Sequence, residues 1–153
     1  MSNSPIVVDP TWVWNHAQIW GRAVELTHMR YADLMTARPA PDPTAPGLWA
    51  YPLDSYVELG LWAFSMRMLI RVARAAKSLG LPAAAAAVAA FEAAVDVKEL
   101  TYFRDVLEHA DEYAAGVGRH KVRGTNVDFD GWTAAAAKLR ADLREAIRPE
   151  QTG

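Results

Sequence analysis

The segment LDSYVELGLWAFSMRMLIRVARAAKSLG, residues 53–80, decides the fold class of this chain. It is rich in apolar residues, it contains no proline, and its limits are marked by Asp54 near the start and Gly80 at the end. A glycine just beyond the last turn commonly ends an α-helix, because it adopts the left-handed backbone conformation without strain. The segment therefore predicts one long helix that opens near Asp54 and is closed by Gly80.

Comparable patterns predict four further helices, over residues 10–37, 82–95, 97–115 and 132–147. Pro10 follows Asp9, and a proline in the first turn after a capping residue is a common helix start. Between the first two helices, residues 38–47 contain four prolines and a glycine and are expected to form a loop. The whole chain, residues 1–153, is expected to be one all-α domain, an up-and-down bundle of about five helices. Residues 1–9 and 149–153 are expected to be flexible.

Composition excludes several classes of protein. Of the 153 residues, 52% are hydrophobic and 22% charged, the formal net charge is −2, and there is no cysteine. Disordered and collagen-like chains have other compositions, and a chain without cysteine has no disulfide, thiolate zinc site or cysteine nucleophile.

Membrane insertion is not expected either. No apolar run reaches the ~18 residues of a membrane-spanning helix, because Arg67, Arg71 and Arg74 interrupt the best candidate. The first residues lack the basic region and apolar stretch of a secretory signal. We expect a cytoplasmic protein without a membrane partner.

The helix expected at residues 97–115 carries the most suggestive polar residues. Its apolar stripe includes Leu100 and Phe103, and its opposite side carries Asp105 and His109. Asp105 and His109 are four residues apart, so the carboxylate can hold one imidazole nitrogen. Arg104 and Glu108 have the same spacing and can pair. Arg104 and His109 are separated by ~140° around the helix axis and do not share a face. A solvated helix face with two ordinary ion pairs explains this pattern equally well.

The stretch RDVLEH, residues 104–109, resembles the R-x4-H signature of HEPN (higher eukaryotes and prokaryotes nucleotide-binding) domains. Those domains are compact all-α bundles whose signature lies on a late helix. The resemblance implies a ribonuclease that needs no metal or other cofactor and whose active site forms across a homodimer. Arg104 would then stabilise the phosphorane, His109 would act as acid or base, and Asp105 would orient His109.

The resemblance also implies partners. A toxin or phage-defence role would involve RNA and possible protein partners, either an antitoxin or a regulatory protein. Two basic stretches are candidates for holding the RNA backbone: Arg67, Arg71 and Arg74 on the helix at residues 54–79, and Arg119, Lys121 and Arg123 after the signature. A solvated helix face and a solvated loop are the plain alternatives for these two stretches.

Two other interpretations remain open. The same bundle can serve as a non-catalytic interaction or regulatory protein. The sequence E-x-x-H at Glu25 and His28 is one half of a di-iron ligand set, which Glu58 and Glu92 on other helices would have to complete.

The chain also departs from the HEPN toxins that pair with a nucleotidyltransferase antitoxin, because position 111 is Asp where those proteins tend to carry tyrosine.

Overall fold

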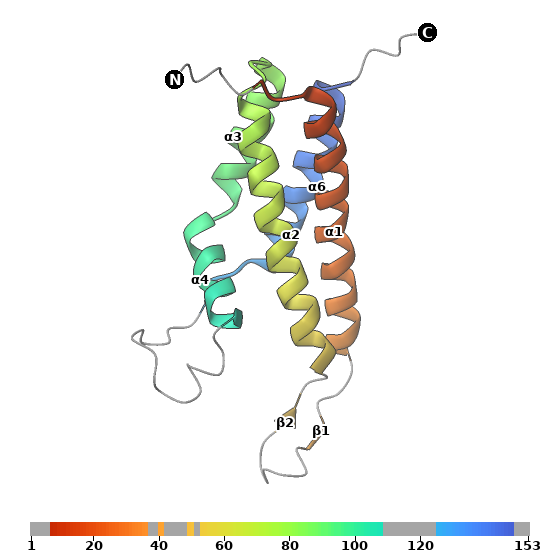
Figure 1. Cartoon of the computed structure of the whole chain (residues 1–153). Helices are drawn as coiled ribbons and strands as arrows, with labels where there is room; N and C mark the ends of the chain where they lie inside the picture. The colour runs from red at the N-terminus through yellow and green to blue at the C-terminus, as the bar shows by residue number, and fades with distance from the viewer. Residues whose placement is uncertain (1–6, 37–39, 42–48, 51–52, 109–124, 149–153) are drawn as a thin grey trace, which may run out of the picture.

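The chain forms an elongated bundle of α-helices (Figure 1). The computed structural model describes residues 7–36, 40–41, 49–50, 53–108 and 125–148. Helix α1 spans Pro10–Thr36, α2 Leu53–Lys77, α3 Pro82–Ala94, α4 Val97–Glu108 and α6 Phe129–Ala146. The expected all-α class and helical bundle are confirmed.

The five described helices occupy four columns of the bundle. Figure 1 shows α1 and α2 running in opposite directions, whereas α3 and α4 follow each other in the same direction and share one side. The break between them lies at Asp96, whose Oδ1 accepts hydrogen bonds from the backbone N–H groups of Lys98 at 2.9 Å and Glu99 at 3.0 Å. Asp96 therefore starts a new helix where the chain could have continued the old one. As a result α3 packs mainly on α6, and α4 packs on α2.

The described helix limits follow the proline and glycine signals, except at the start of the last helix. The expected end of the fourth helix, at residue 115, lies outside the described residues. Gly80 ends the second helix with a φ of 70°, in the left-handed region that the sequence predicts for it. The last helix begins at Phe129, three residues before the expected start at Trp132. Asp128 is its N-cap, and its side chain accepts a hydrogen bond from the backbone N–H of Gly131 at 2.9 Å. The capping carboxylate thus draws Gly131, expected in a loop, into the first turn.

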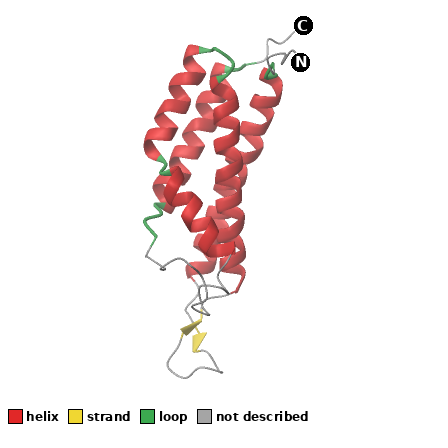
Figure 2. Ribbon diagram, turned by 60° about the vertical axis from the view of Figure 1, so that its left-hand side comes forward, coloured by secondary structure: helices red, strands yellow, loops and turns green. Residues whose placement is uncertain are grey.

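Two short strands lie beyond the ends of α1 and α2 (Figure 2). Strand β1, Ala40–Pro41, pairs antiparallel with β2, Trp49–Ala50. The expected loop at residues 38–47 therefore contains one strand of a two-residue ladder. The terminal segments 1–6 and 149–153, which the sequence predicts to be flexible, lie outside the described residues.

The core is organised around Trp62 of α2, which is fully buried. Its ring lies 6.5 Å from that of Phe103 on α4, 4.8 Å from that of Phe129 and 6.3 Å from that of Trp132, both on α6. Its indole N–H donates to Thr133 Oγ1 at 3.0 Å, so the one polar atom of the ring is satisfied. This aromatic cluster joins α2, α4 and α6 at one level of the bundle.

Helices α1 and α6 approach closely at Gly21. A Cβ atom at this position would lie 2.8 Å from Cβ and 2.9 Å from Cδ of Arg140. Any side chain here would push the two helices apart, which explains a glycine in the middle of a long helix. No described helix is both long enough and apolar enough to cross a membrane.

A double-mutant cycle tests the buried hydrogen bond of Trp62. Trp62→Phe should lower the free energy of unfolding by about 2 kcal/mol or more, because it removes buried atoms and leaves the Thr133 hydroxyl without its partner. Adding Thr133→Val should then cost less than the same substitution in the wild type, since no hydroxyl remains to be satisfied. Urea unfolding followed by circular dichroism measures all four proteins. Strictly additive costs would show that this hydrogen bond does not stabilise the fold.

Candidate functional site

Four arginines from two helices line one cavity between α2 and α4, which we call the arginine groove. Arg67, Arg71 and Arg74 come from α2, and Arg104 comes from α4. The cavity has a volume of about 320 Å³. Its remaining wall consists largely of apolar side chains, among them the buried Ile70 and Leu100.

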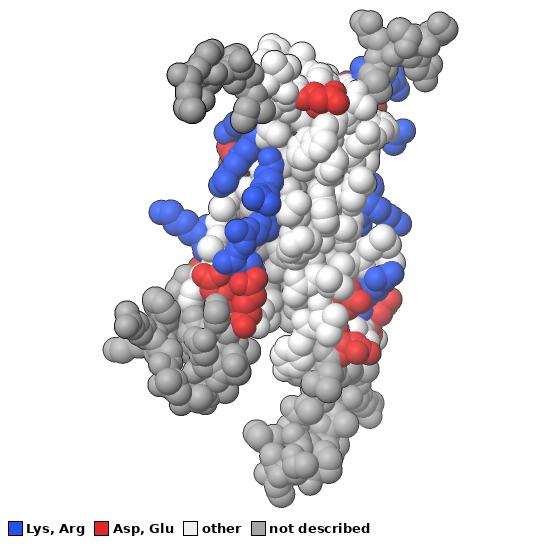
Figure 3. Space-filling view, in the orientation of Figure 1, with Lys and Arg blue, Asp and Glu red and all other residues white. Residues whose placement is uncertain are grey.

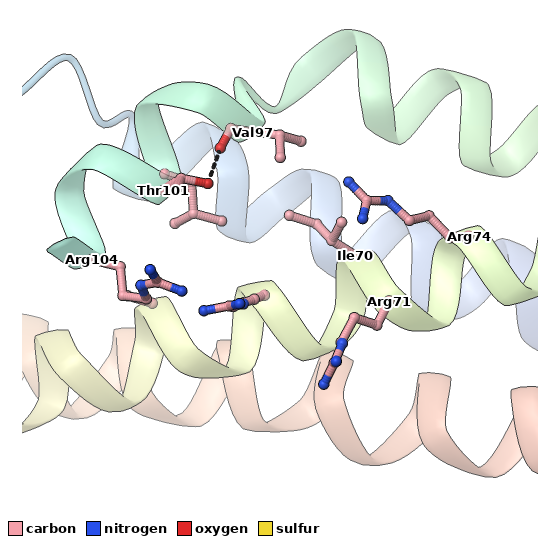
Figure 4. Close-up of a pocket in the computed structure, with 9 residues that line it drawn as sticks. Ile70, Arg71, Arg74, Val97, Thr101 and Arg104 are labelled. Carbon is pink, nitrogen blue, oxygen red and sulfur yellow. Dashed lines mark hydrogen bonds between the residues drawn. The ribbon is translucent and has the colours of Figure 1, made fainter.

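The four arginines do not all point the same way (Figure 4). Arg74 points from α2 toward the side on which α4 lies, and Arg104 points from α4 toward α2. Arg71 points away from α4. Thr101 also lines the groove, but its hydroxyl donates to the carbonyl of Val97 at 2.8 Å and is therefore satisfied.

The three arginines of α2 are exposed and carry uncompensated charge within the described part of the chain. Arg67, Arg71 and Arg74 form no ion pair with another described residue, and Arg71 contacts only the sulfur of Met68 at 4.0 Å. Lys77, next along the same helix, pairs with Glu92 of α3 instead. Three like charges beside a partly apolar cavity form a local positively charged surface on a chain whose net charge is −2.

Arg104 differs from the other three because it is already paired. Its side chain is 22% exposed, its Nε donates to Asp105 Oδ1 at 3.1 Å, and its Nε lies 3.5 Å from Glu108 Oε2. The expected pairing of Arg104 with Glu108 is confirmed. Asp105, expected to orient His109, contacts Arg104 in the structure, and His109 lies outside the described residues. Figure 3 shows the consequence on the surface: a basic stripe that ends against a group of acidic side chains.

The second basic stretch cannot be placed relative to the groove. Arg119, Lys121 and Arg123 fall in residues 109–124, which lie outside the described part of the chain. The groove therefore brings together four of the residues singled out in the sequence: Arg67, Arg71 and Arg74 as RNA contacts, and Arg104 as a catalytic residue.

Sequence reasoning placed Arg104 and the α2 arginines in different roles and did not foresee that they share a cavity. Spacing along one helix indicates which residues share its face, but it does not indicate which neighbouring helix lies against that face. The apolar wall was missed for the same reason. Leu100 is a core residue by periodicity, and only the packing of α4 on α2 makes it part of the groove.

Three residues of the hypothetical di-iron site, Glu25, His28 and Glu92, pair with other side chains, and Glu92 pairs with Lys77. The fourth, Glu58, has a buried Oε2 atom without a hydrogen-bond partner among the described residues. Glu25 pairs with Arg22 at 3.0 Å and with Arg140 at 3.2 Å, and His28 Nε2 lies 2.7 Å from Asp130 Oδ1. Among the residues that the structure describes, no three His, Cys, Asp or Glu side chains come together in a group that could hold a metal ion. The convergence of carboxylates that this hypothesis requires does not occur there.

Comparison with known proteins identifies no relative: no protein-family model, no curated protein and no solved structure matches the chain.

The carboxylates beside Arg104 should weaken anion binding in the groove. Replacing both, by Asp105→Asn and Glu108→Gln, frees the guanidinium and removes two negative charges from the end of the groove. The double variant should bind inorganic tripolyphosphate several-fold more tightly, as isothermal titration calorimetry would measure. Its stability should fall by no more than about 1 kcal/mol, because both carboxylates are partly exposed.

Asp142→Asn provides the matched control, because Asp142 pairs with Lys138 on α6 and does not line the groove. Equal affinities for the double variant, the control and the wild type would show that Arg104 is not part of an anion site.

Proposed function

We propose that this chain binds RNA and that the arginine groove holds the phosphate backbone. The observation that carries the proposal is the convergence of four arginines from α2 and α4 on one cavity. A guanidinium group offers a planar set of donors that suits phosphate oxygens, and it keeps its charge at every physiological pH.

Several features of the groove suit a polyanion better than an isolated ion. Arg67, Arg71 and Arg74 follow one another at intervals of about one turn along α2, about 4.5–6 Å apart along the axis, so they present a row of charges. The three are exposed and free of ion pairs with other described residues. Contacts of this kind give affinity without choosing a base sequence. The choice of RNA over other polyanions comes from the resemblance to HEPN domains.

Cleavage of the bound RNA is the second candidate function, of the toxin or phage-defence kind that the resemblance implies. It is favoured by the position of Arg104, the signature arginine, in the same cavity as the α2 arginines. In this scheme His109 takes the proton of the 2′-hydroxyl, whose oxygen attacks the phosphorus. The bond between phosphorus and the 5′-oxygen breaks, and the 5′-oxygen leaves as a hydroxyl after it takes up a proton. Arg104 leaves Asp105 and Glu108 to stabilise the negative charge on the phosphorane oxygens. A protein partner would regulate this activity.

The pairing of Arg104 within its own helix favours binding over cleavage. A guanidinium that is held by Asp105 and approached by Glu108 has less capacity to stabilise a transition state. Its release costs the ion pairs that the resting structure forms. A non-catalytic RNA-binding protein needs no such release.

Salt dependence of RNA binding tests the groove. Binding of a fluorescent single-stranded RNA should weaken with salt, and each phosphate contact contributes about −0.7 to the slope of log K against log salt concentration. Arg74→Gln should weaken binding similarly for different RNA sequences and make the slope less negative by about 0.7. Fluorescence anisotropy at several salt concentrations measures both quantities.

Arg144→Gln on α6 is the matched control, because Arg144 is exposed and does not line the groove. If Arg144→Gln changes the slope as much as Arg74→Gln does, binding is diffuse and the groove is not its site.

Cleavage is tested separately, with labelled RNA in the presence of EDTA. A ribonuclease of the expected kind should cut RNA under these conditions, and both His109→Ala and Arg104→Gln should lower the rate by at least about 100-fold. If the protein binds RNA but does not cut it, the RNA-binding function stands and the ribonuclease function is rejected. Cleavage that survives both substitutions would point to a contaminating nuclease.

A further inference from the structure

One face of α2 carries a regular row of residues that the described part of the chain leaves exposed or only partly covered. We call this row the α2 seam: Asp54, Val57, Leu61, Phe64, Met68 and Arg71. Val57 is 58% exposed, Leu61 45% and Phe64 51%. Large exposed apolar side chains arranged in one contiguous row indicate an interaction surface.

The spacing of the seam is that of a coiled coil. Its members follow one another at intervals of three and four residues in strict alternation, which is the heptad pattern of two helices packed along their length. The residues that α2 buries inside the bundle, such as Trp62, Met66 and Leu69, lie on the other side of the helix. Helix α2 therefore has two apolar faces, and the described part of the chain buries one of them.

We infer that the α2 seam binds the α2 seam of a second copy of this chain, with the two helices antiparallel. The charges at the two ends of the seam favour the antiparallel arrangement over the parallel one. The seam begins with Asp54 and ends with Arg71, and neither forms an ion pair with another described residue. Parallel packing would set like charges against each other at both ends, whereas antiparallel packing sets each Arg71 against the Asp54 of the other copy. In such a dimer Arg71, which points away from α4, pairs with Asp54, and Arg67, Arg74 and Arg104 remain for the phosphate backbone.

The register of the pair follows from the same residues. Asp54 lies seven positions before Leu61, and Arg71 lies seven positions after Phe64. A two-fold axis between Leu61 and Phe64 therefore aligns both charge pairs at once. It also places Leu61 against Phe64 and Val57 against Met68, so every seam residue has a suitable neighbour across the axis.

Gly60 supplies a second, independent observation. It lies within α2, and a Cβ atom added to it would have no neighbouring atom within 4 Å, so no described residue requires a glycine there. Gly21 differs, because the side chain of Arg140 packs directly on it. In the antiparallel pair, Gly60 borders the hole that receives Phe64 of the other copy, and its missing side chain makes room for the ring. Trp20 of α1 packs edge-on against Phe64 at 5.6 Å and steadies the ring.

A charge swap tests this interface in the full-length protein without nucleic acid, so that binding in the arginine groove does not enter. Sedimentation equilibrium should show a wild-type dimer. Arg71→Asp and Asp54→Arg should each weaken dimerisation about tenfold or more, because each sets like charges against each other at both ends of the seam. The double variant carrying both substitutions should restore dimerisation toward the wild-type affinity. Arg144→Asp, the same charge change on the exposed surface of α6, should leave the dimer unchanged.

Rescue by the double variant is specific to two copies packed antiparallel, because residues 54 and 71 are about 25 Å apart along one helix and cannot compensate each other within a chain. A wild-type monomer at high micromolar concentration would overturn the inference, and so would a dimer that the single variants leave intact or that the double variant fails to restore.

Gly60→Gln gives a second measurement. Glutamine favours the helix over glycine, so this variant should melt at a higher temperature than the wild type under dilute conditions where both are monomers. It should nevertheless dimerise more weakly, because its side chain fills the space for Phe64. A variant that dimerises as well as the wild type would contradict the proposed packing at this position.

Discussion

Trp62 is buried where α2, α4 and α6 meet. Its ring and its N–H group fix the positions of different neighbouring helices. The ring contacts aromatic side chains of both other helices and so fixes how far α4 stands from α2. The N–H group donates to Thr133 and so fixes the position of α6 along α2. Arg104 directly follows Phe103, the α4 residue in this cluster, so the position of its side chain depends on the same contacts. The packing of the aromatic core therefore determines the shape of the arginine groove.

The helices could be predicted from the sequence, because proline and glycine stand near the positions where helices begin and end. Gly80 behaved as its residue type predicts, and the third helix starts at Pro82 as expected. The start of α6 was predicted too late, because the cap at Asp128 stands in a segment rich in glycine and gave no periodic signal. The short ladder between β1 and β2 was missed because two-residue strands are too brief to show an alternating pattern.

The candidate site could be predicted only in part. Helical spacing identified the three arginines of α2 as neighbours and predicted that Arg104 pairs with Glu108. It gave no information on which helices are adjacent, and adjacency is what places Arg104 in the same cavity as the α2 arginines. The seam on α2 was hidden for a related reason. The sequence of α2 is apolar on more than one side, and only the exposure of its residues in the folded chain separates the two faces of this helix.

The break at Asp96 has a consequence for how the groove can change. The α2 wall is held by α1, whereas the α4 wall begins after the break and is held by the aromatic cluster. The width of the cavity can therefore be altered by repacking Phe103 or Phe129, without touching any arginine. Charge and shape are set by different residues, so the positive charge of the groove and the width of its cavity can vary independently of each other.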